Sequence, residues 1–150
     1  MATIVLSLLF LLEPGASGRP APSPSPPTID WPGFFASVTT RGLVFSDRLK
    51  ALEGKRVRLR GYSVVLPEWS GGLILTRYAY VESDPNDPED VLDIPYDAVG
   101  VRWRSGLEIS RVPQRPTVEG TLRLENAAVG PQRVALLLED AVPVVPTKVP

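Results

Sequence analysis

Arginine and aromatic residues recur together along the middle of the chain, and their side chains could bind another molecule. Guanidinium groups contact phosphates and aromatic rings stack on nucleobases, so this mixture is typical of surfaces that bind single-stranded nucleic acid. Trp, Tyr and Arg also serve as anchors in protein interfaces. The candidate binding residues are Arg58, Arg60, Tyr62, Trp69, Arg77, Tyr78, Tyr80, Arg102 and Trp103.

The overall charge does not favour nucleic acid as the partner. The chain has 16 Lys and Arg residues against 17 Asp and Glu residues, which gives a formal net charge of −1. Phosphate contacts dominate nucleic-acid affinity, and a balanced chain has no positive field to attract a polyanion. We therefore interpret the arginines as the solvated face of a sheet. About half of the aromatic residues are expected to be buried, and Trp69, on a predicted loop, is the one most expected to be exposed.

The residues needed for most hydrolytic chemistry are missing. The chain contains no histidine and no cysteine, which removes imidazole bases, thiol nucleophiles and the usual ligands of zinc. Two carboxylate pairs occur, Asp84 with Asp87 and Glu139 with Asp140. They fall in a predicted turn and at a predicted strand end, without an apolar pocket to separate their pKa values. We predict no catalytic residues, no cofactor and no enzymatic activity.

The segment 82–90 is acidic and could offer oxygen ligands to calcium. Its spacing does not match an EF-hand loop, since glycine is missing at the sixth position and a carboxylate at the twelfth. Pro85 and Pro88 indicate a stiff turn. We expect a solvated connection without a metal; a calcium-dependent surface module is the alternative.

The amino-terminal segment is typical of exported proteins. Residues 4–12 are apolar apart from Ser7, which is shorter than the roughly 17–25 residues that a membrane-spanning helix needs. Small residues at 16–18 suit signal peptidase, so residues 1–18 are predicted to be a signal peptide, although no Lys or Arg precedes the apolar run. Residues 19–32 are predicted to be a proline-rich linker. These features predict a bacterial periplasmic or secreted protein without a stable transmembrane anchor.

Residues 45–66 predict a short helix followed by a strand. Ser46 suits a helix N-cap and Gly54 a terminator. Val57 and Leu59 then alternate with arginines, as in a half-buried strand. After Gly61 the apolar positions move by one residue, which predicts a β-bulge that bends the strand.

Further strands are predicted at residues 71–81, 91–103, 117–125 and 133–145. The segment 91–103 is expected to be broken at residues 95–97, and the last strand to be covered on both faces. Residues 104–115 receive no assignment. The predicted fold is mainly β: a small five-stranded antiparallel barrel, OB-fold-like, with one short N-terminal helix. It occupies residues 33–145, and 146–150 form a tail. An SH3-like barrel or a small sandwich is the alternative.

Four stretches also carry a family resemblance: LEGKRVRLRGYSVVL, GGLILTRYAY, DIPYDAVGVRW and VEGTLRL. Together they resemble a divergent member of a group of uncharacterised bacterial secreted proteins with a predicted OB-like fold. The resemblance covers residues 49–144 and is most specific over residues 54–62. Better-known members carry a segment with cysteine, histidine and a proline run where this chain has residues 80–95, without Cys or His. The resemblance therefore implies a fold and export, with no metal or redox role.

The sequence thus predicts an exported, non-enzymatic OB-like module that binds or assembles with a protein or a cell-envelope component. Recognition would use the barrel face or its loops, chiefly the loop at Trp69 and the segment 82–90. A cytoplasmic single-stranded nucleic-acid-binding OB domain is the alternative.

Overall fold

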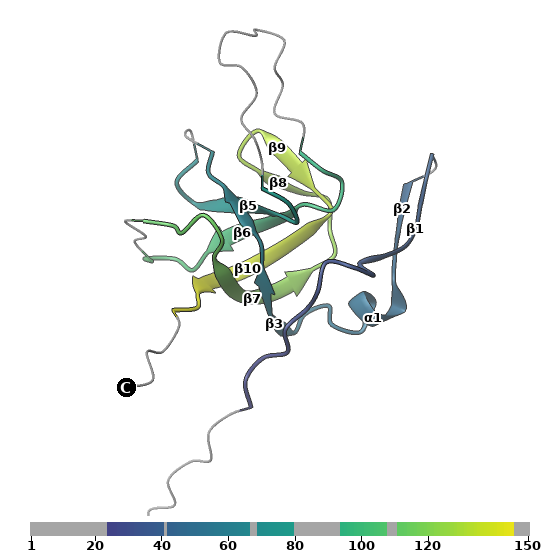
Figure 1. Cartoon of the computed structure of the whole chain (residues 1–150), viewed down its shortest axis with the longest axis horizontal. Helices are drawn as coiled ribbons and strands as arrows, with labels where there is room; N and C mark the ends of the chain where they lie inside the picture. Colours follow the sequence, from purple (N-terminus) through teal and green to yellow (C-terminus); the bar gives the residue numbers. More distant parts are fainter. Residues whose placement is uncertain (1–23, 41, 67–68, 80–93, 108–110, 146–150) are drawn as a thin grey trace, which may run out of the picture.

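The computed structural model describes residues 24–40, 42–66, 69–79, 94–107 and 111–145, and these residues are mainly β (Figure 1). The predicted signal peptide, the segment 82–90 and the tail 146–150 lie outside them. In chain order the elements are β1 (Phe35–Thr39), β2 (Gly42–Phe45), α1 (Asp47–Lys50), β3 (Arg56–Arg60), β4 (Tyr62–Val64), β5 (Gly72–Thr76), β6 (Val99–Trp103), β7 (Thr117–Arg123), β8 (Ala127–Val129), β9 (Gln132–Val134) and β10 (Leu136–Pro143).

The main sheet is a curled half-barrel of six strands in the order β3-β7-β10-β6-β5-β4. The prediction of a mainly β fold is confirmed, but the predicted five-stranded antiparallel barrel is a six-stranded half-barrel with one parallel pair. The predicted first strand divides at Gly61 into β3 and β4, which lie at opposite ends of the strand order. β6 and β10 run parallel, whereas the other pairs in this sheet are antiparallel.

The shift of apolar positions after Gly61 reflects packing in a second core, where a β-bulge was predicted. Val57 and Leu59 of β3 belong to an inner core on the concave face of the sheet, whereas Val64 and Leu66 belong to an outer core on the other face. The odd-numbered apolar residues of β3 therefore face the inner core, whereas the even-numbered apolar residues from Val64 to Leu66 face the outer core. The apolar positions change parity because the strand passes from one core to the other.

The inner core fills the half-barrel and includes Val57, Leu59, Leu73, Leu75, Val99, Val101, Val118, Leu122, Leu136, Leu138 and Ala141. The outer core lies beneath the β8–β9 hairpin and consists of Val64, Leu66, Ile74, Ala98, Ala127, Val129, Val134 and Leu137. Leu136 and Leu138 point into the inner core and Leu137 into the outer one. The prediction that the last strand is covered on both faces is confirmed for this part of β10.

The end of the predicted linker lies along the edge of β3, at the purple end of the ribbon in Figure 1. Thr28 forms a parallel bridge with Arg58, whose N–H donates to the Pro27 carbonyl at 2.8 Å and whose carbonyl accepts from the Ile29 N–H at 2.8 Å. Ile29 is buried in the inner core. Because the prolines before Thr28 are dense, few further N–H groups could extend this pairing.

The β1–β2 hairpin forms a separate two-stranded sheet beside the half-barrel (Figure 1). It was not predicted as strands. Ser46 follows it and caps α1, since the Leu49 N–H donates to its Oγ at 3.3 Å. The predicted helix at 45–54 is thus confirmed but has only one turn, Asp47–Lys50, followed by further turns to Gly54.

Candidate functional site

The predicted basic surface is an ion-pair network on the outer face of the sheet. The network consists of two groups of ion pairs between neighbouring strands. In the first, Arg56, Arg58 and Arg104 pair with Glu119 and Asp140; in the second, Arg102 and Arg123 pair with Glu139. The arginines of one strand therefore meet acids of its neighbours, which the linear sequence does not reveal.

Glu119 joins the two arginines of β3. Its carboxylate accepts from Arg56 Nε at 3.1 Å and from Arg58 Nε at 3.0 Å, because Arg58 stands directly opposite Glu119 in the β3–β7 register. Partial burial of the Glu119 carboxyl raises its pKa, but the hydrogen bonds and charges of both arginines outweigh this effect. The net pKa of Glu119 is below its usual value.

A bulge in β10 places two consecutive acids on the same face. Between Glu139 and Val142, β10 advances three residues while β7 advances two, and Asp140 has a φ of 49°. Aspartate tolerates this left-handed conformation better than most residues do. Gly120 lies close by: a Cβ there would be 3.0 Å from the Glu139 carbonyl oxygen. Glu139 and Asp140 therefore both point outward.

Each of these acids binds two arginines. Asp140 accepts from Arg104 Nε and Nη2, both at 2.9 Å, and from Arg56 Nη1 at 3.0 Å. Glu139 accepts from Arg102 at 3.1 Å and Arg123 at 3.0 Å. The hydrogen bond from Arg104, with the charges of Arg104 and Arg56, lowers the pKa of Asp140, and the pKa of Arg104 is raised in turn.

The predicted binding residues do not share one surface. Arg58 and Arg102 belong to the network, and Trp103 packs on the inner core. Arg60 is exposed, and its carbonyl accepts from the Trp31 indole N–H at 2.7 Å.

The other predicted aromatic residues are also dispersed. Tyr62 lies under the Arg115 guanidinium, 5.1 Å from ring centroid to Cζ, and Arg77 lies over the Tyr78 ring at the same distance. Trp69 packs against the outer core and covers Gly72, so it is half-buried and the expectation that it would be exposed is wrong. Tyr78 is instead 70% exposed. Tyr80 lies outside the described residues.

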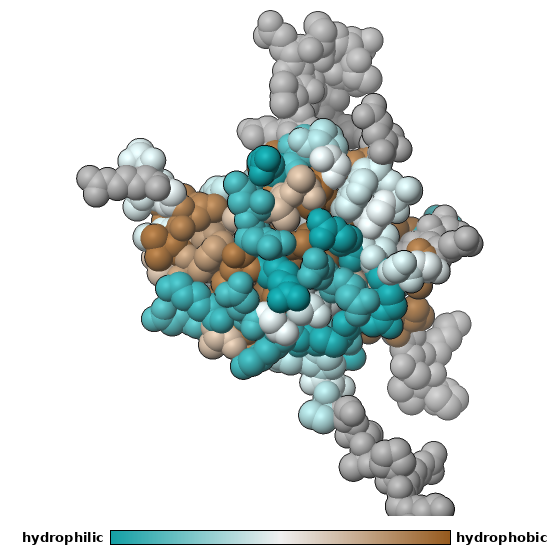
Figure 2. All heavy atoms as spheres, turned by 180° about the vertical axis from the view of Figure 1, so that it is seen from behind, coloured by the Kyte–Doolittle hydropathy of each residue, from teal (hydrophilic) through white to brown (hydrophobic). Residues whose placement is uncertain are grey.

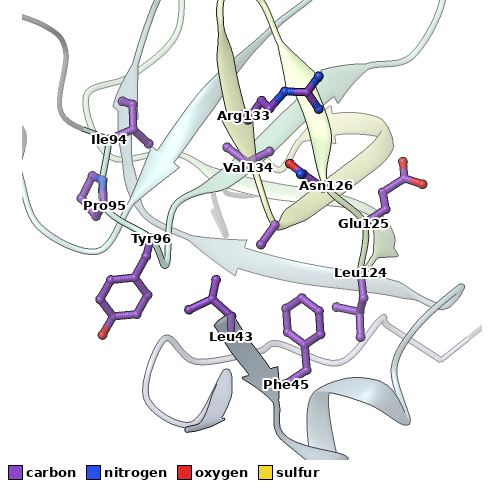
Figure 3. A pocket seen from close by; sticks show the side chains of 11 residues that line it. Leu43, Phe45, Ile94, Pro95, Tyr96, Leu124, Glu125, Asn126, Arg133 and Val134 are labelled. Atoms are coloured by element: carbon purple, nitrogen blue, oxygen red, sulfur yellow. The ribbon is translucent and has the colours of Figure 1, made fainter. Parts of the chain in front are cut away.

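A groove of about 450 Å³, with mostly apolar lining side chains and a polar rim, lies between the β1–β2 hairpin and the half-barrel (Figure 3). Four separate segments line it: β2, residues 94–96, residues 124–126 and residues 133–135. Its lining residues are Leu43, Phe45, Ile94, Pro95, Tyr96, Leu124, Glu125, Asn126, Arg133, Val134 and Ala135. In Figure 3, Leu43 and Phe45 lie on one side, with Tyr96 and Ile94 along another.

The hairpin wall of this groove begins in the core and ends in solvent. Phe35 packs against the inner core and contacts the rings of Phe45 and Tyr96, with centroids at 5.5 and 5.7 Å. Farther along the hairpin, Val38 pairs with Leu43 but is 51% exposed, and Tyr96 is 59% exposed. Figure 2 shows hydrophobic residues gathered on the side from which the hairpin projects.

Polar side chains stand at the upper rim of the groove in Figure 3: Glu125, Asn126 and Arg133. No ion pair involves Glu125 or Arg133 within the described ranges. The rim thus offers one carboxylate, one guanidinium and an amide. None of the lining residues was predicted as a site residue. The glycine at position 42 between two apolar stretches was a hairpin signal, but Ala36, an extra residue in β1, interrupts the alternation there.

Neither metal-ligand clusters nor membrane-spanning helices occur in the part of the chain that the structure describes. No group of three or more His, Cys, Asp or Glu side chains there could hold a metal ion. No helix there is long and apolar enough to cross a bilayer. The acidic segment 82–90, considered as a calcium ligand, is outside this part.

Comparison with known proteins gives one distant structural likeness. No family model matches the chain, and no curated protein matches it. A solved structure of a DUF3299 family protein from Pseudomonas aeruginosa PAO1 is similar, with 23% sequence identity and a TM-score of 0.43. The similar region covers 64% of this chain and 65% of that chain, less than two thirds of each. This likeness is too distant to assign an activity or a partner.

Proposed function

We propose that the protein is an exported, non-enzymatic OB-like module that binds another protein through the groove beside the β1–β2 hairpin. The partner inserts an extended segment with apolar side chains. The observation that carries this proposal is the apolar groove of about 450 Å³, whose hairpin wall continues from the core into solvent.

The composition of the groove supports a protein partner. Large exposed apolar residues that cluster are typical of interaction sites, whereas single ones are ordinary. The exposed Tyr96 lies at the groove together with the half-buried Leu43 and Phe45, and the exposed Val38 pairs with Leu43 across the hairpin. A rim with one carboxylate and one guanidinium favours a polar, nearly neutral backbone over a polyanion. Nucleic acid is disfavoured elsewhere too, because Arg58 and Arg102 are already paired with carboxylates.

Two features of the sheet support the OB-like assignment. β3 and β4 are consecutive halves of one bent strand, and they pair with β7 and β5 at opposite ends of the sheet. The N–H of Ser63 in β4 also donates to the Gln114 carbonyl at 2.9 Å, which brings the segment before β7 alongside β4. A bent first strand shared by both sides is what a partly open Greek-key barrel of this type requires. The chain would then be a divergent member of the secreted family that residues 54–62 resemble.

The amino-terminal segments support export of the protein and a tether to the domain. Residues 1–18 have the composition of a signal peptide, and the described proline-rich residues lead away from the edge of β3. In Figure 1 this segment leaves the lower end of the molecule, whereas β8 and β9 lie at the upper end. A tether attached there leaves the groove open to a partner in the periplasm or outside the cell.

Photo-crosslinking in the host cell tests the groove. A benzoylphenylalanine at Tyr96, in the groove, should give a defined adduct with one partner protein, whereas the same group at the exposed Tyr78 should not. Adding Leu43→Glu should abolish the adduct by placing a charge in the apolar wall. Val44→Glu is the matched control, since Val44 is not among the residues that line the groove and is 47% exposed.

The outcome that would overturn the proposal is an adduct at Tyr96 that survives Leu43→Glu while the variant remains folded. Equal adducts at Tyr96 and Tyr78 would also overturn it, because they would show collision without a site. The intact mass of the exported protein, compared with a chain beginning near Arg19, tests the export step separately.

A further inference from the structure

We infer that the partner segment binds as an additional β-strand on the free edge of β2. This inference rests on the proposed function, since it states how the groove is occupied. It names the chemistry of the occupant: an extended segment of another protein with an apolar side chain at every second position.

The edge of β2 is unpaired in the described structure. β1 and β2 form a sheet of their own, in which β2 pairs with β1 on one side and with no strand of the described residues on the other. No backbone hydrogen bond from another described segment reaches Leu43, Val44 or Phe45. An exposed strand edge is a ready template for another chain, and an isolated two-stranded hairpin is marginally stable alone. A third strand would remove both problems.

The register of the hairpin shows which backbone groups face the free edge. Thr39 pairs with Gly42 across a two-residue turn, and Val38 pairs with Leu43. In an antiparallel pair, hydrogen-bonded and non-hydrogen-bonded residue pairs alternate, and a two-residue turn is closed by a hydrogen-bonded pair. Leu43 is therefore in a non-hydrogen-bonded pair and directs its N–H and carbonyl outward, whereas Val44 bonds to β1.

The same strand that offers this edge also forms the groove wall. The side chains of Leu43 and Phe45 line the groove (Figure 3), so a strand beside β2 would run over Leu124 and Val134. Neighbouring strands lie about 4.8 Å apart and alternate their side chains between faces. Every second side chain of the added strand would then enter the apolar groove. The intervening side chains would face solvent and must be polar.

Strand addition accounts for the mixed polar groups at the rim, which a purely apolar side-chain pocket would not need. Glu125, Asn126 and Arg133 at the rim can bond to a peptide backbone, which carries both donors and acceptors. A partner recognised through its backbone needs such mixed groups.

A model peptide with alternating residues tests the inference on the full-length protein. The probe is an acetylated, amidated nonapeptide of alternating Thr and Val between two terminal Lys residues. We expect binding with a Kd of about 1 mM or tighter. Hydrogen exchange followed by NMR should show the Leu43 amide slowed at least tenfold, with the Val44 amide unchanged. Leu43→Glu should remove binding, and Val44→Glu should not.

A backbone-methylated peptide separates strand addition from side-chain capture. It has the same side chains, but N-methyl groups remove backbone N–H donors along both of its edges. It should therefore bind at least tenfold more weakly. Equal binding of the two peptides would overturn strand addition while leaving the groove proposal intact. Failure of the unmethylated peptide to bind would also overturn it, whereas the crosslink at Tyr96 decides the proposed function by itself. The Leu43 amide should not become more protected when the protein is concentrated without peptide. If it does, the occupant is a second copy of the chain, and a separate partner is rejected.

Discussion

The ion-pair network and the groove differ in whether their binding groups are already satisfied. In the network, five guanidinium groups surround three carboxylates, and each carboxylate accepts from two arginines. In the groove, most lining side chains are apolar. Among the described residues, the rim charges form no ion pairs and the neighbouring edge of β2 has no partner strand. The charges of the ion-pair network are thus largely neutralised within the protein, whereas the groove has groups that are still available to bind a partner.

This difference teaches that residue type alone is a poor guide to a binding site. Arginines attract attention in the sequence because they can bind phosphate, but their availability depends on the strands beside them. β3 brings Arg58 opposite Glu119, and the bulge in β10 brings Asp140 to Arg104. We interpret the network as holding the strands in register. The groove, whose groups are not paired in this way, is the surface that we propose for recognition.

The largest effect is expected from removing the space that the β10 bulge needs. Gly120→Val adds side-chain atoms where even a Cβ would lie 3.0 Å from both the Glu139 carbonyl oxygen and the Leu138 Cβ. The backbone must move, and the free energy of unfolding should fall by about 3 kcal/mol. Urea denaturation measures this loss. An unchanged midpoint would show that the bulge does not determine the placement of Glu139 and Asp140.

Much of this fold could be predicted from local patterns. Ser46 and the alternation around Val57 identify α1 and β3, and the consecutive leucines at 136–138 identify a strand covered on both faces. The bulge in β10 could not be located, because Glu139 and Asp140 before an apolar stretch also suit a strand end. Its physical cause is the need to return Ala141 to the inner core.

The candidate site was harder to predict than the strands. Its lining residues come from four segments, and only the three-dimensional arrangement brings Leu43 near Ile94 and Leu124. The β-bulge predicted after Gly61 was wrong for a related reason. The sequence shows that the apolar positions shift by one residue, but it does not show that a second core exists. Ion pairs between strands depend on register, which local patterns do not give.

The next largest loss of stability, from a substitution of Glu119, tests whether the ion-pair network has a structural role. Glu119→Ala leaves Arg56 and Arg58 without their shared acceptor, and the Glu119 side chain is 17% exposed. We expect the free energy of unfolding to fall by about 1–2 kcal/mol. Lys50→Ala is the control, since its pair with Asp47 is on the surface of α1 and should change stability by less than about 0.5 kcal/mol. Equal effects of the two variants would reject a structural role for Glu119.

The third effect is the loss of this contribution in acid. The pKa values of Glu119 and Asp140 are lowered from 4.5 and 3.8 in the folded protein. A carboxyl whose pKa is lower when folded contributes stability above its unfolded pKa, and this contribution disappears as pH falls through the folded value. Wild-type stability should therefore decrease below about pH 4.5 more steeply than that of Glu119→Gln. Urea midpoints measured across this range test the slope; parallel curves would contradict it.

The smallest effect on stability is expected in the groove, although the effect on binding there is the largest. Leu43 is half-buried at a wall without a partner, so Leu43→Glu should change the free energy of unfolding by about 0.5 kcal/mol or less. In the double variant with Glu119→Ala, the two changes should add, because the network and the groove share no residue. Glu119→Ala alone should leave the Tyr96 crosslink unchanged. Coupling above about 0.5 kcal/mol, or a lost crosslink in the folded Glu119→Ala protein, would show that the network also shapes the binding surface.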